Sequence, residues 1–293
     1  MMKISGATIV KNAVLYGYPI VESIKSLLPL VDEYVVNIGK SQDDTKKLIE
    51  SIKDPKIKII ETEWDESIRT GGLILSIQTN YAIKHCTGDW IFYLQADEVL
   101  HEDDYDEIYN TIKVFNDDQR VDGFAFNFLH FYGSAWTYKN ARNWYKNEVR
   151  IIRNNGKIFS YGDAQSFRLI DGEKPKAKLI NARIFHYGWA RPHSVLIKKV
   201  VDFNKLWHND EYIVTKFADF DIYKCLNELD NLEVFTGRHP KVMMGNKEFL
   251  SLENFLFIMQ LREKYIKQRS ILQYLKALSK KIPIGRYRGF KKI

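Results

Sequence analysis

Cysteine, long apolar runs and repeated segments are all scarce in this chain of 293 residues. Its two cysteines, Cys86 and Cys225, are too few for a disulfide framework and favour a reducing compartment. No stretch approaches the roughly 18 consecutive apolar residues of a membrane-spanning helix. The N-terminus carries Lys3 early and has no long apolar segment, so we expect no signal peptide and a cytoplasmic location.

Acidic residues are in the minority as well. The 44 Lys and Arg against 37 Asp and Glu give a net charge of +7, which allows phosphorylated ligands, anionic lipid or nucleic acid as partners. Hydrophobic residues make up 45% of the chain, enough for a sizeable core in one large or two small domains. The aromatic content of 14% is high, and we expect most of these rings in the core.

Segments typical of strands and of helices alternate over roughly the first hundred residues. Pro19 and Pro29 bracket one amphipathic helix, and Gly71-Gly72 precede another. For that second helix we expect an inward face formed by Leu73, Ile74, Ile77 and Tyr81. The expected strands are residues 4–10, 33–38, 57–60 and 90–94. This alternation predicts an α/β fold with a doubly wound, mostly parallel sheet.

The pattern changes after residue 98. A helix is expected near residues 105–115, followed by a half-buried strand at 124–128 in which aromatic residues alternate with small or polar ones. Further strands are expected at 148–153 and 179–185, which gives the sheet a mixed second half. From Val195 onward the chain favours helices, with one apolar face formed by Leu196, Val200, Phe203 and Trp207.

Two acids, Asp97 and Glu98, directly follow the apolar segment that begins after Gly88. A short apolar run bounded by a turn is typical of a strand buried on both faces. Carboxylates at the end of such a strand lie where open α/β sheets bind ligands, and they suit Mg²⁺ or Mn²⁺ and, through the metal, a diphosphate. The alternative is an acidic first turn of the next helix, favoured by the helix dipole.

Four segments, in this order, resemble the family 2 glycosyltransferases, which have the GT-A fold. The resemblance covers roughly residues 4 to 192 and predicts a Rossmann-like α/β domain. The four segments are Ile9–Asn12; Leu28–Val36 with Ser41, Asp43 and Thr45; Asn80 and Gly88–Trp90 with Gln95–Glu98; and His186–Arg191.

The resemblance implies a nucleotide-sugar donor, a divalent metal, Mn²⁺ or Mg²⁺, and inverting transfer. Asp97 and His186 are the predicted metal ligands, and Asp163 is the candidate catalytic base on the acceptor side. Arg69 and Arg191 have guanidinium groups that suit phosphate oxygens, although each is equally explained as a surface arginine. The residues predicted to bind the nucleotide sugar are Val10, Asn12, Asn37, Arg69, Asn80, Gln95 and Arg191.

Three positions depart from the family pattern. Gln95 replaces the first acid of the Asp-x-Asp motif, and an amide supplies less charge to a cation than a carboxylate does. Ile38 and Gly39 stand where acids usually read the base, which leaves the donor base open. On the acceptor side, either Asp163 or Gln165 occupies the position of the catalytic acid.

The chain ends in a strongly basic segment after residue 260, with leucines interleaved among lysines and arginines. One interpretation is an amphipathic helix on an anionic membrane surface, at the inner face of the membrane, which suits a lipid-linked acceptor. The other is a solvated helix packed on the catalytic domain. We predict a catalytic domain over residues 1–240, with a donor half of about 1–100 and an acceptor half of about 101–240, and a basic helical extension over 241–293.

We therefore predict a metal-dependent inverting glycosyltransferase that acts on a glycan or lipid-linked acceptor, without nucleic acid as a partner. One alternative is a non-catalytic glycan- or nucleic-acid-binding protein, which the basic charge and the aromatic residues permit. A sugar-phosphate nucleotidyltransferase is a further alternative. It requires a glycine-rich basic loop after the first strand, and residues 11–16 do not supply one.

Overall fold

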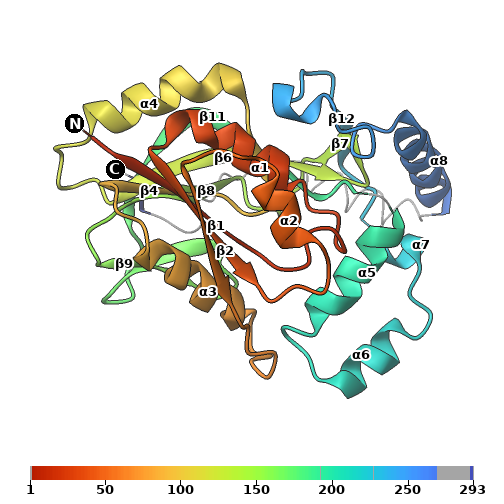
Figure 1. The fold of residues 1–293 in the computed structure, drawn as a ribbon. Helices are drawn as coiled ribbons and strands as arrows, with labels where there is room; N and C mark the ends of the chain where they lie inside the picture. The colour runs from red at the N-terminus through yellow and green to blue at the C-terminus, as the bar shows by residue number, and fades with distance from the viewer. Residues whose placement is uncertain (1, 192, 227, 269–290, 293) are drawn as a thin grey trace.

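The computed structural model of the protein describes residues 2–191, 193–226, 228–268 and 291–292. Most of its strands form one large sheet (Figure 1). They are β1 (Ile4–Val10), β2 (Glu33–Gly39), β3 (Ile57–Thr62), β4 (Trp90–Tyr93), β5 (Glu98–Leu100), β6 (Gly123–Tyr132), β7 (Ser134–Lys139), β8 (Asn147–Arg153), β11 (Lys176–Trp189), β12 (Leu232–Val234) and β13 (Lys291–Lys292). A separate pair consists of β9 (Ile158–Tyr161) and β10 (Ser166–Leu169).

The order of the main path through the sheet is β12-β7-β6-β8-β4-β1-β2-β3, and β11 pairs with β5, β6 and β13. Strands β4, β1, β2 and β3 are parallel to their neighbours in this group. Strand β8 runs antiparallel between β4 and β6, and β11 is parallel to β6 but antiparallel to β5. The predicted α/β fold, with a parallel first half and a mixed second half, is confirmed.

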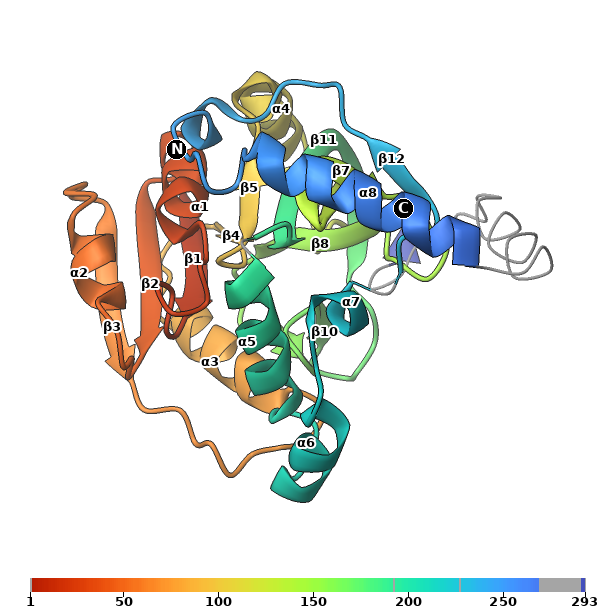
Figure 2. The same cartoon turned by 90° about the vertical axis from the view of Figure 1, so that its right-hand side faces the viewer.

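Helices cover both faces of the sheet (Figures 1 and 2). They are α1 (Ile20–Leu27), α2 (Thr45–Glu50), α3 (Leu73–Lys84), α4 (Tyr105–Val114), α5 (His193–Asn204), α6 (Asp210–Phe217), α7 (Ile222–Cys225) and α8 (Leu252–Gln268). Helices α1, α2 and α4 pack on one face, and α3 packs on the other beside β9. Short 3-10 turns occur at Leu28–Leu30, Glu102–Asp104 and Lys241–Met243.

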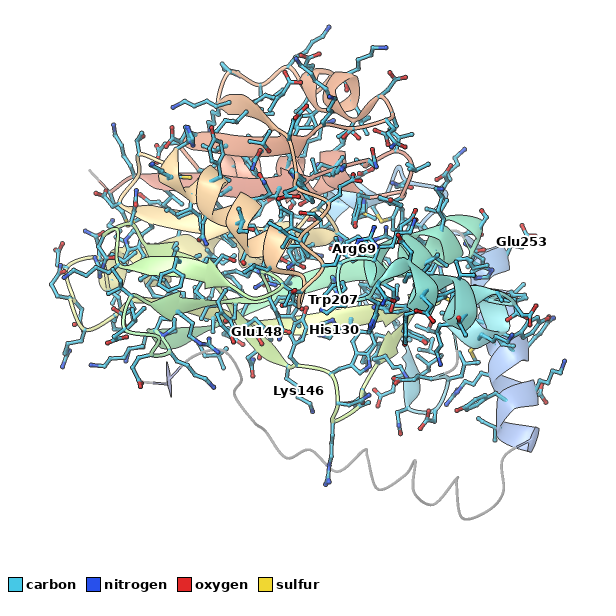
Figure 3. The ribbon with its side chains drawn as sticks, turned by 90° about the horizontal axis from the view of Figure 1, so that it is seen from below. Arg69, His130, Lys146, Glu148, Trp207 and Glu253 are labelled. Carbon is cyan, nitrogen blue, oxygen red and sulfur yellow. The ribbon has the colours of Figure 1, made fainter. Side chains whose placement is uncertain are left out.

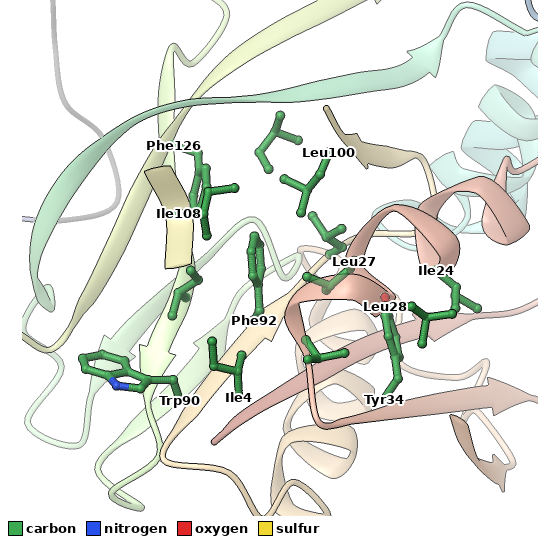
Figure 4. Close-up of a cluster of buried hydrophobic side chains, with 14 of the residues drawn as sticks. Ile4, Ile24, Leu27, Leu28, Tyr34, Trp90, Phe92, Leu100, Ile108 and Phe126 are labelled. Atoms are coloured by element: carbon green, nitrogen blue, oxygen red, sulfur yellow. The ribbon is translucent and has the colours of Figure 1, made fainter. Parts of the chain in front are cut away.

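Strand β4 is buried on both faces, as its apolar sequence predicts. Trp90 and Phe92 enter the core beneath α1 and α4, where Figure 4 shows them among the surrounding aliphatic side chains, while Ile91 and Tyr93 enter the core on the α3 side. The prediction that residues 124–128 are half-buried is wrong for 124–126. Because β6 lies inside the sheet, Phe124 and Phe126 fill one core and Ala125 fills the other.

The predicted inward face of α3 is wrong for three of its four residues. Leu73, Ile77 and Tyr81 are each more than 40% exposed, whereas Ile74 is buried. The other buried residues of the helix are Ser76, Gln78, Thr79 and Ala82. The face of α3 toward the sheet therefore combines these polar residues with Ile74 and with the core contacts of Leu75, Ala82 and Ile83.

Polar groups of the sheet explain this orientation. The Asn37 side-chain amide on β2 donates to Oε1 and to the backbone oxygen of Gln78, each at 3.0 Å. The Thr62 hydroxyl on β3 shares its one proton between Asn37 Oδ1 at 2.7 Å and Gln78 Oε1 at 2.9 Å. Buried polar groups need hydrogen-bond partners, and the polar face of α3 supplies them.

Two further predictions concern the part of the chain from α5 onward. Helix α5 ends at Asn204, so Trp207 lies in the turn that follows and not on the helical face shared by Leu196, Val200 and Phe203. Of the basic helical extension predicted over 241–293, residues 269–290 and 293 lie outside the described residues, whereas α8 is described. Among the described residues, no helix is both long and apolar enough to cross a membrane.

We expect Gln78→Ala to lower the free energy of unfolding by about 1–3 kcal/mol, because it removes a buried partner of Asn37 and Thr62. The matched control is the neighbouring Ile77→Ala, which is 41% exposed and should change stability by about 0.5 kcal/mol or less. Urea denaturation measures both. A larger loss for Ile77→Ala would contradict the polar packing of α3.

Candidate functional site

A cleft of about 800 Å³ opens at the carboxyl ends of β1 and β4. Residues that follow these strands form its floor, and α5 with Trp207 forms the opposite wall. The remaining walls come from the loop before α3, which includes Trp64 and Arg69, and from the loop around Asp163 before β10. Figure 3 labels Arg69 and Trp207 beside this region. Open α/β sheets bind ligands at this edge.

Asp97 lies on the floor of the cleft and is almost fully buried. Its Oδ2 atom accepts hydrogen bonds from Arg191 Nη2 and from Lys199 Nζ, each at 3.1 Å. Burial alone would raise the pKa of Asp97, but the cations Lys199 and Arg191 lower that pKa well below its usual range. The carboxylate is therefore ionised at neutral pH.

The pKa of Lys199 is perturbed because its ammonium group is buried beside Asp97 and Arg191. Burial, together with the charge of Arg191, lowers the pKa of Lys199 to about 8, although Asp97 opposes the shift. Its Nζ also donates to the backbone oxygen of Gly188 at 3.1 Å. A cationic side chain thus projects from α5 onto the floor of the cleft, next to the end of β4.

His186 completes the group around Asp97. Its Nε2 atom lies 3.7 Å from Asp97 Oδ1, too far for a hydrogen bond. Within the described residues, neither of these two atoms has a hydrogen-bond partner. A Cβ atom at Gly188 would lie 2.5 Å from His186 Nε2, so the glycine keeps the space beside this nitrogen open. Burial lowers the pKa of His186, which keeps the imidazole neutral.

These atoms suit a divalent cation. Asp97 Oδ1 and the neutral imidazole nitrogen Nε2 of His186 lie 3.7 Å apart. A side chain at Gly188 would crowd this nitrogen and the second carboxylate oxygen, Oδ2, and glycine leaves that space open. Oxygen and imidazole ligands are those of Mn²⁺, and Mg²⁺ also binds carboxylates. Asp97 and His186 therefore fit the metal that the family implies.

Glu98 does not serve the start of a helix, which was the alternative interpretation of the acidic pair. It lies in β5, fully buried, and forms a two-point ion pair with Arg150 of β8. Arg150 Nε donates to Glu98 Oε2 at 2.7 Å, and Nη2 donates to Oε1 at 2.6 Å. The next helix, α4, begins only at Tyr105. Glu98 and Arg150 are 52 residues apart in the sequence, and no local pattern at either position indicates that they pair.

Asp163 lies in a strained turn at the wall of the cleft. Its neighbours Gly162 and Ala164 both have φ of +61°, and this conformation is uncommon for alanine and costs about 1–3 kcal/mol. Gln95 Nε2 donates to the Ala164 backbone oxygen at 3.2 Å, which ties the turn to the end of β4. Gln165 also lines the cleft, but its amide donates to Glu148 Oε1 at 2.7 Å.

Glu148, which Figure 3 labels, is fully buried and is linked to this turn through Gln165. Its Oε2 atom has no hydrogen-bond partner in the described part of the chain. Burial raises the pKa of Glu148 to about 7, partly offset by Arg150 and Gln165. The protein thus keeps a carboxyl group next to the cleft that changes charge near neutral pH.

The structure brings seven of the predicted site residues to the lining of the cleft. They are Val10, Asn12, Arg69, Gln95, Asp97, Asp163 and His186. Arg69 also forms an ion pair with Asp210 of α6 at 2.6 Å. Their predicted roles stay predictions.

Three other predicted site residues lie behind the wall. Asn37 is buried beneath α3, and Asn80 bonds the backbone of Ser160, which joins α3 to β9. Arg191 is fully buried and reaches the site through Asp97 and the Tyr16 backbone oxygen. These three side chains would contact a donor directly only if the residues that line the cleft in front of them moved.

Several residues of the site carry no recognisable motif in the sequence. Lys199 comes from a helix more than a hundred residues after Asp97, and only the fold joins them. Trp64 occupies the end of β2, where a Cβ atom at Gly39 would lie 2.6 Å from the indole Nε1. The indole thus covers the end of β2, and a side chain at Gly39 would collide with it.

Comparisons with known proteins place the chain among glycosyltransferases. The model of the family described as Glycosyl transferase family 2 matches residues 8–174. An uncharacterized glycosyltransferase of Rickettsia felis is 31% identical over 119 residues, which are 41% of this chain and 37% of that protein. The match therefore spans little more than a third of the length of this curated relative.

Solved structures give more distant matches. S. aureus TarS 1-349 in complex with UDP is 13% identical, over 74% of this chain and 71% of that chain, with a TM-score of 0.41. Glucosyl-3-phosphoglycerate synthase from Mycobacterium tuberculosis, with Mn²⁺, UDP and phosphoglyceric acid, is 15% identical over 45% of this chain and 43% of that chain. Its TM-score is 0.31.

We expect Glu148→Gln to stabilise the protein by about 1–3 kcal/mol at pH 8 and by much less at pH 5. The folded-state pKa of about 7 lies above the ordinary 4.5, so the stability associated with the protonated carboxyl is lost as pH rises through this window. Urea denaturation at both pH values measures the difference. The exposed Glu253→Gln is the control, and an equal effect of Glu148→Gln at both pH values would contradict the prediction.

Proposed function

The chain belongs to glycosyl transferase family 2, and from this premise we propose that it is an inverting, divalent-metal-dependent enzyme. It transfers a sugar from a nucleotide-sugar donor to a hydroxyl group of a glycan or lipid-linked acceptor. The observation that carries the proposal is the meeting of Asp97, which follows β4, with His186 of β11. Asp97 Oδ1 and His186 Nε2 lie 3.7 Å apart, and glycine at position 188 leaves the space beside Nε2 open.

The donor diphosphate is the group that needs the positive charge at this site. A divalent cation held by Asp97 Oδ1 and His186 Nε2 would stabilise the negative charge that develops on the departing diphosphate. Lys199 adds a protein cation to the same floor. Arg191 stays behind Asp97 and keeps its carboxylate ionised. Asp97 is thus held in the charged state that metal binding requires.

Asp163 is the proposed catalytic base. As the acceptor hydroxyl attacks the anomeric carbon, the Asp163 carboxylate takes its proton, and a new carbon–oxygen bond forms. The bond between the anomeric carbon and the diphosphate breaks, and the electron pair leaves with the nucleoside diphosphate. A single displacement inverts the anomeric carbon, so an α-linked donor gives a β-linked product. The strained turn supports this role because it holds Asp163 at the cleft wall.

The acceptor is proposed from charge. The net charge of +7 suits a phosphorylated or lipid-linked acceptor, and the basic segment predicted after residue 260 suits contact with an anionic membrane surface. Such contact would be peripheral, at the inner face of the membrane. The enzyme then meets its acceptor at the lipid surface without crossing it.

We expect Asp163→Asn to lower the rate of sugar transfer by about 10²–10⁴-fold, because it removes the base, and to leave nucleotide affinity unchanged. The assay measures release of nucleoside diphosphate from UDP-, GDP- and dTDP-sugars with Mn²⁺ and a panel of sugar and lipid-linked acceptors. Asp171→Asn, an exposed carboxylate after β10, is the matched control and should retain full activity.

Two outcomes would contradict the proposal, each in a different part. Full activity of Asp163→Asn would exclude this residue as the base while leaving the transferase intact. Absence of release from every donor, in a protein that still binds sugar nucleotides, would instead favour a binding protein on the same fold.

A further inference from the structure

A second histidine lies directly behind His186. His130 of β6 is the strand partner of His186 of β11 in the parallel register. The Nδ1 atoms of the two rings are 2.9 Å apart, which is a hydrogen-bond distance. The other nitrogen of His130, Nε2, lies 2.8 Å from the backbone oxygen of Tyr145. Both rings therefore belong to one chain of hydrogen bonds that begins at the Tyr145 carbonyl.

The positions of the protons follow from the chemistry of these groups. A carbonyl oxygen only accepts, so His130 must carry its proton on Nε2 to donate to Tyr145. A neutral His130 then has a bare Nδ1, and the contact of 2.9 Å requires the proton to come from Nδ1 of His186. A neutral His186 with its proton on Nδ1 has a bare Nε2. This is the nitrogen that faces Asp97.

The surroundings of His130 keep it neutral and oriented. The ring is nearly fully buried, with Tyr145 and Trp144 edge-on to it and Phe128 stacked on it. Burial, with the additional effect of His186, lowers the pKa of His130 well below its ordinary value. Aromatic packing on several sides leaves the ring little freedom to rotate, so its acceptor atom stays directed at His186.

We propose that His130 is a positioning residue that accepts the Nδ1 proton of His186 and thereby keeps Nε2 of His186 bare and directed to the metal position beside Asp97. This inference rests on the proposed metal-dependent function. Ligating histidines commonly bond through their other ring nitrogen to an outer partner that fixes tautomer and orientation. Here that partner is a second imidazole in place of the usual carboxylate or carbonyl.

The role matters more in this chain than in one with two motif acids. Gln95 stands where the family pattern has an acid, and its amide nitrogen is committed to the Ala164 backbone oxygen. Of the proposed protein ligands, Asp97 supplies the only full negative charge. The imidazole of His186 therefore supplies a large share of the protein's bonding to the metal. In the other tautomer, Nε2 would carry the proton and present an N–H to the cation.

Two substitutions separate this role from simple packing. His130→Asn leaves an amide oxygen that can accept the Nδ1 proton of His186, whereas His130→Phe fills the aromatic surroundings without an acceptor. Free Mn²⁺ is measured by electron paramagnetic resonance during titration of each full-length protein with Mn²⁺ alone. We expect His130→Phe to weaken Mn²⁺ binding by about 10–100-fold, and His130→Asn to retain most of the affinity.

A second readout needs no metal. In the metal-free wild type, nitrogen-15 NMR of the imidazole rings should show His186 protonated on Nδ1 and bare on Nε2, and His130→Phe should lose this single form. Thermal melting of all three proteins without metal establishes that each variant is folded. If His130→Phe does not fold, the wild-type spectrum and His130→Asn still decide the question.

The possible results test the role of His130 and the metal dependence of the protein separately. Mn²⁺ binding by His130→Phe as tight as in the wild type would overturn the role of His130, as would equal losses in both variants. A wild-type spectrum with the His186 proton on Nε2, alongside intact Mn²⁺ binding, would also overturn that role and leave the metal-dependent function standing. Absence of Mn²⁺ binding in the wild type would overturn the metal dependence and, with it, the role of His130.

Discussion

The buried ion pair between Glu98 and Arg150 is the contact on which the geometry of the site depends. Both side chains are fully buried and meet through two hydrogen bonds. Glu98 Oε2 also accepts from the Gln95 backbone N–H at 3.1 Å, and Arg150 Nη1 donates to the Gln165 backbone oxygen at 2.8 Å. The pair thus joins the turn that carries Asp97 to the loop that carries Asp163. Loss of either partner would leave an uncompensated buried charge, which typically costs about 3–5 kcal/mol.

Two buried cations determine the charge of Asp97. A carboxylate this deeply buried would normally be protonated, yet Arg191 from behind and Lys199 from α5 keep it ionised. Both cations bond to Oδ2, so Oδ1 is left for another positive charge from the cleft. His186 reaches the same place as a neutral ring. The site therefore combines a fixed negative charge with a neutral donor atom, which suits a metal ion that binds together with a diphosphate.

Local sequence patterns predicted much of the fold but only part of the site. Apolar periodicity located the first four strands, and the order of motifs singled out Asp97 and His186, which line the same cleft. The same periodicity gave the wrong face for α3, because the polar groups of Asn37 and Thr62 attract its polar side and leave Ile77 exposed. Partners that meet only through the fold, such as Lys199 with Asp97, leave no mark at either position in the sequence.

The most direct test of the account is whether nucleotide binding requires both a metal and Asp97. Thermal melting of the wild type and of Asp97→Asn would be followed with UDP, GDP, CDP and dTDP, each with and without Mn²⁺. A nucleotide at a hundred times its dissociation constant stabilises the folded protein by about 2.7 kcal/mol. We expect one nucleotide to raise the melting temperature of the wild type only with Mn²⁺, and Asp97→Asn to show no such rise. An equal rise in Asp97→Asn, or none in the wild type with any nucleotide, would contradict this expectation.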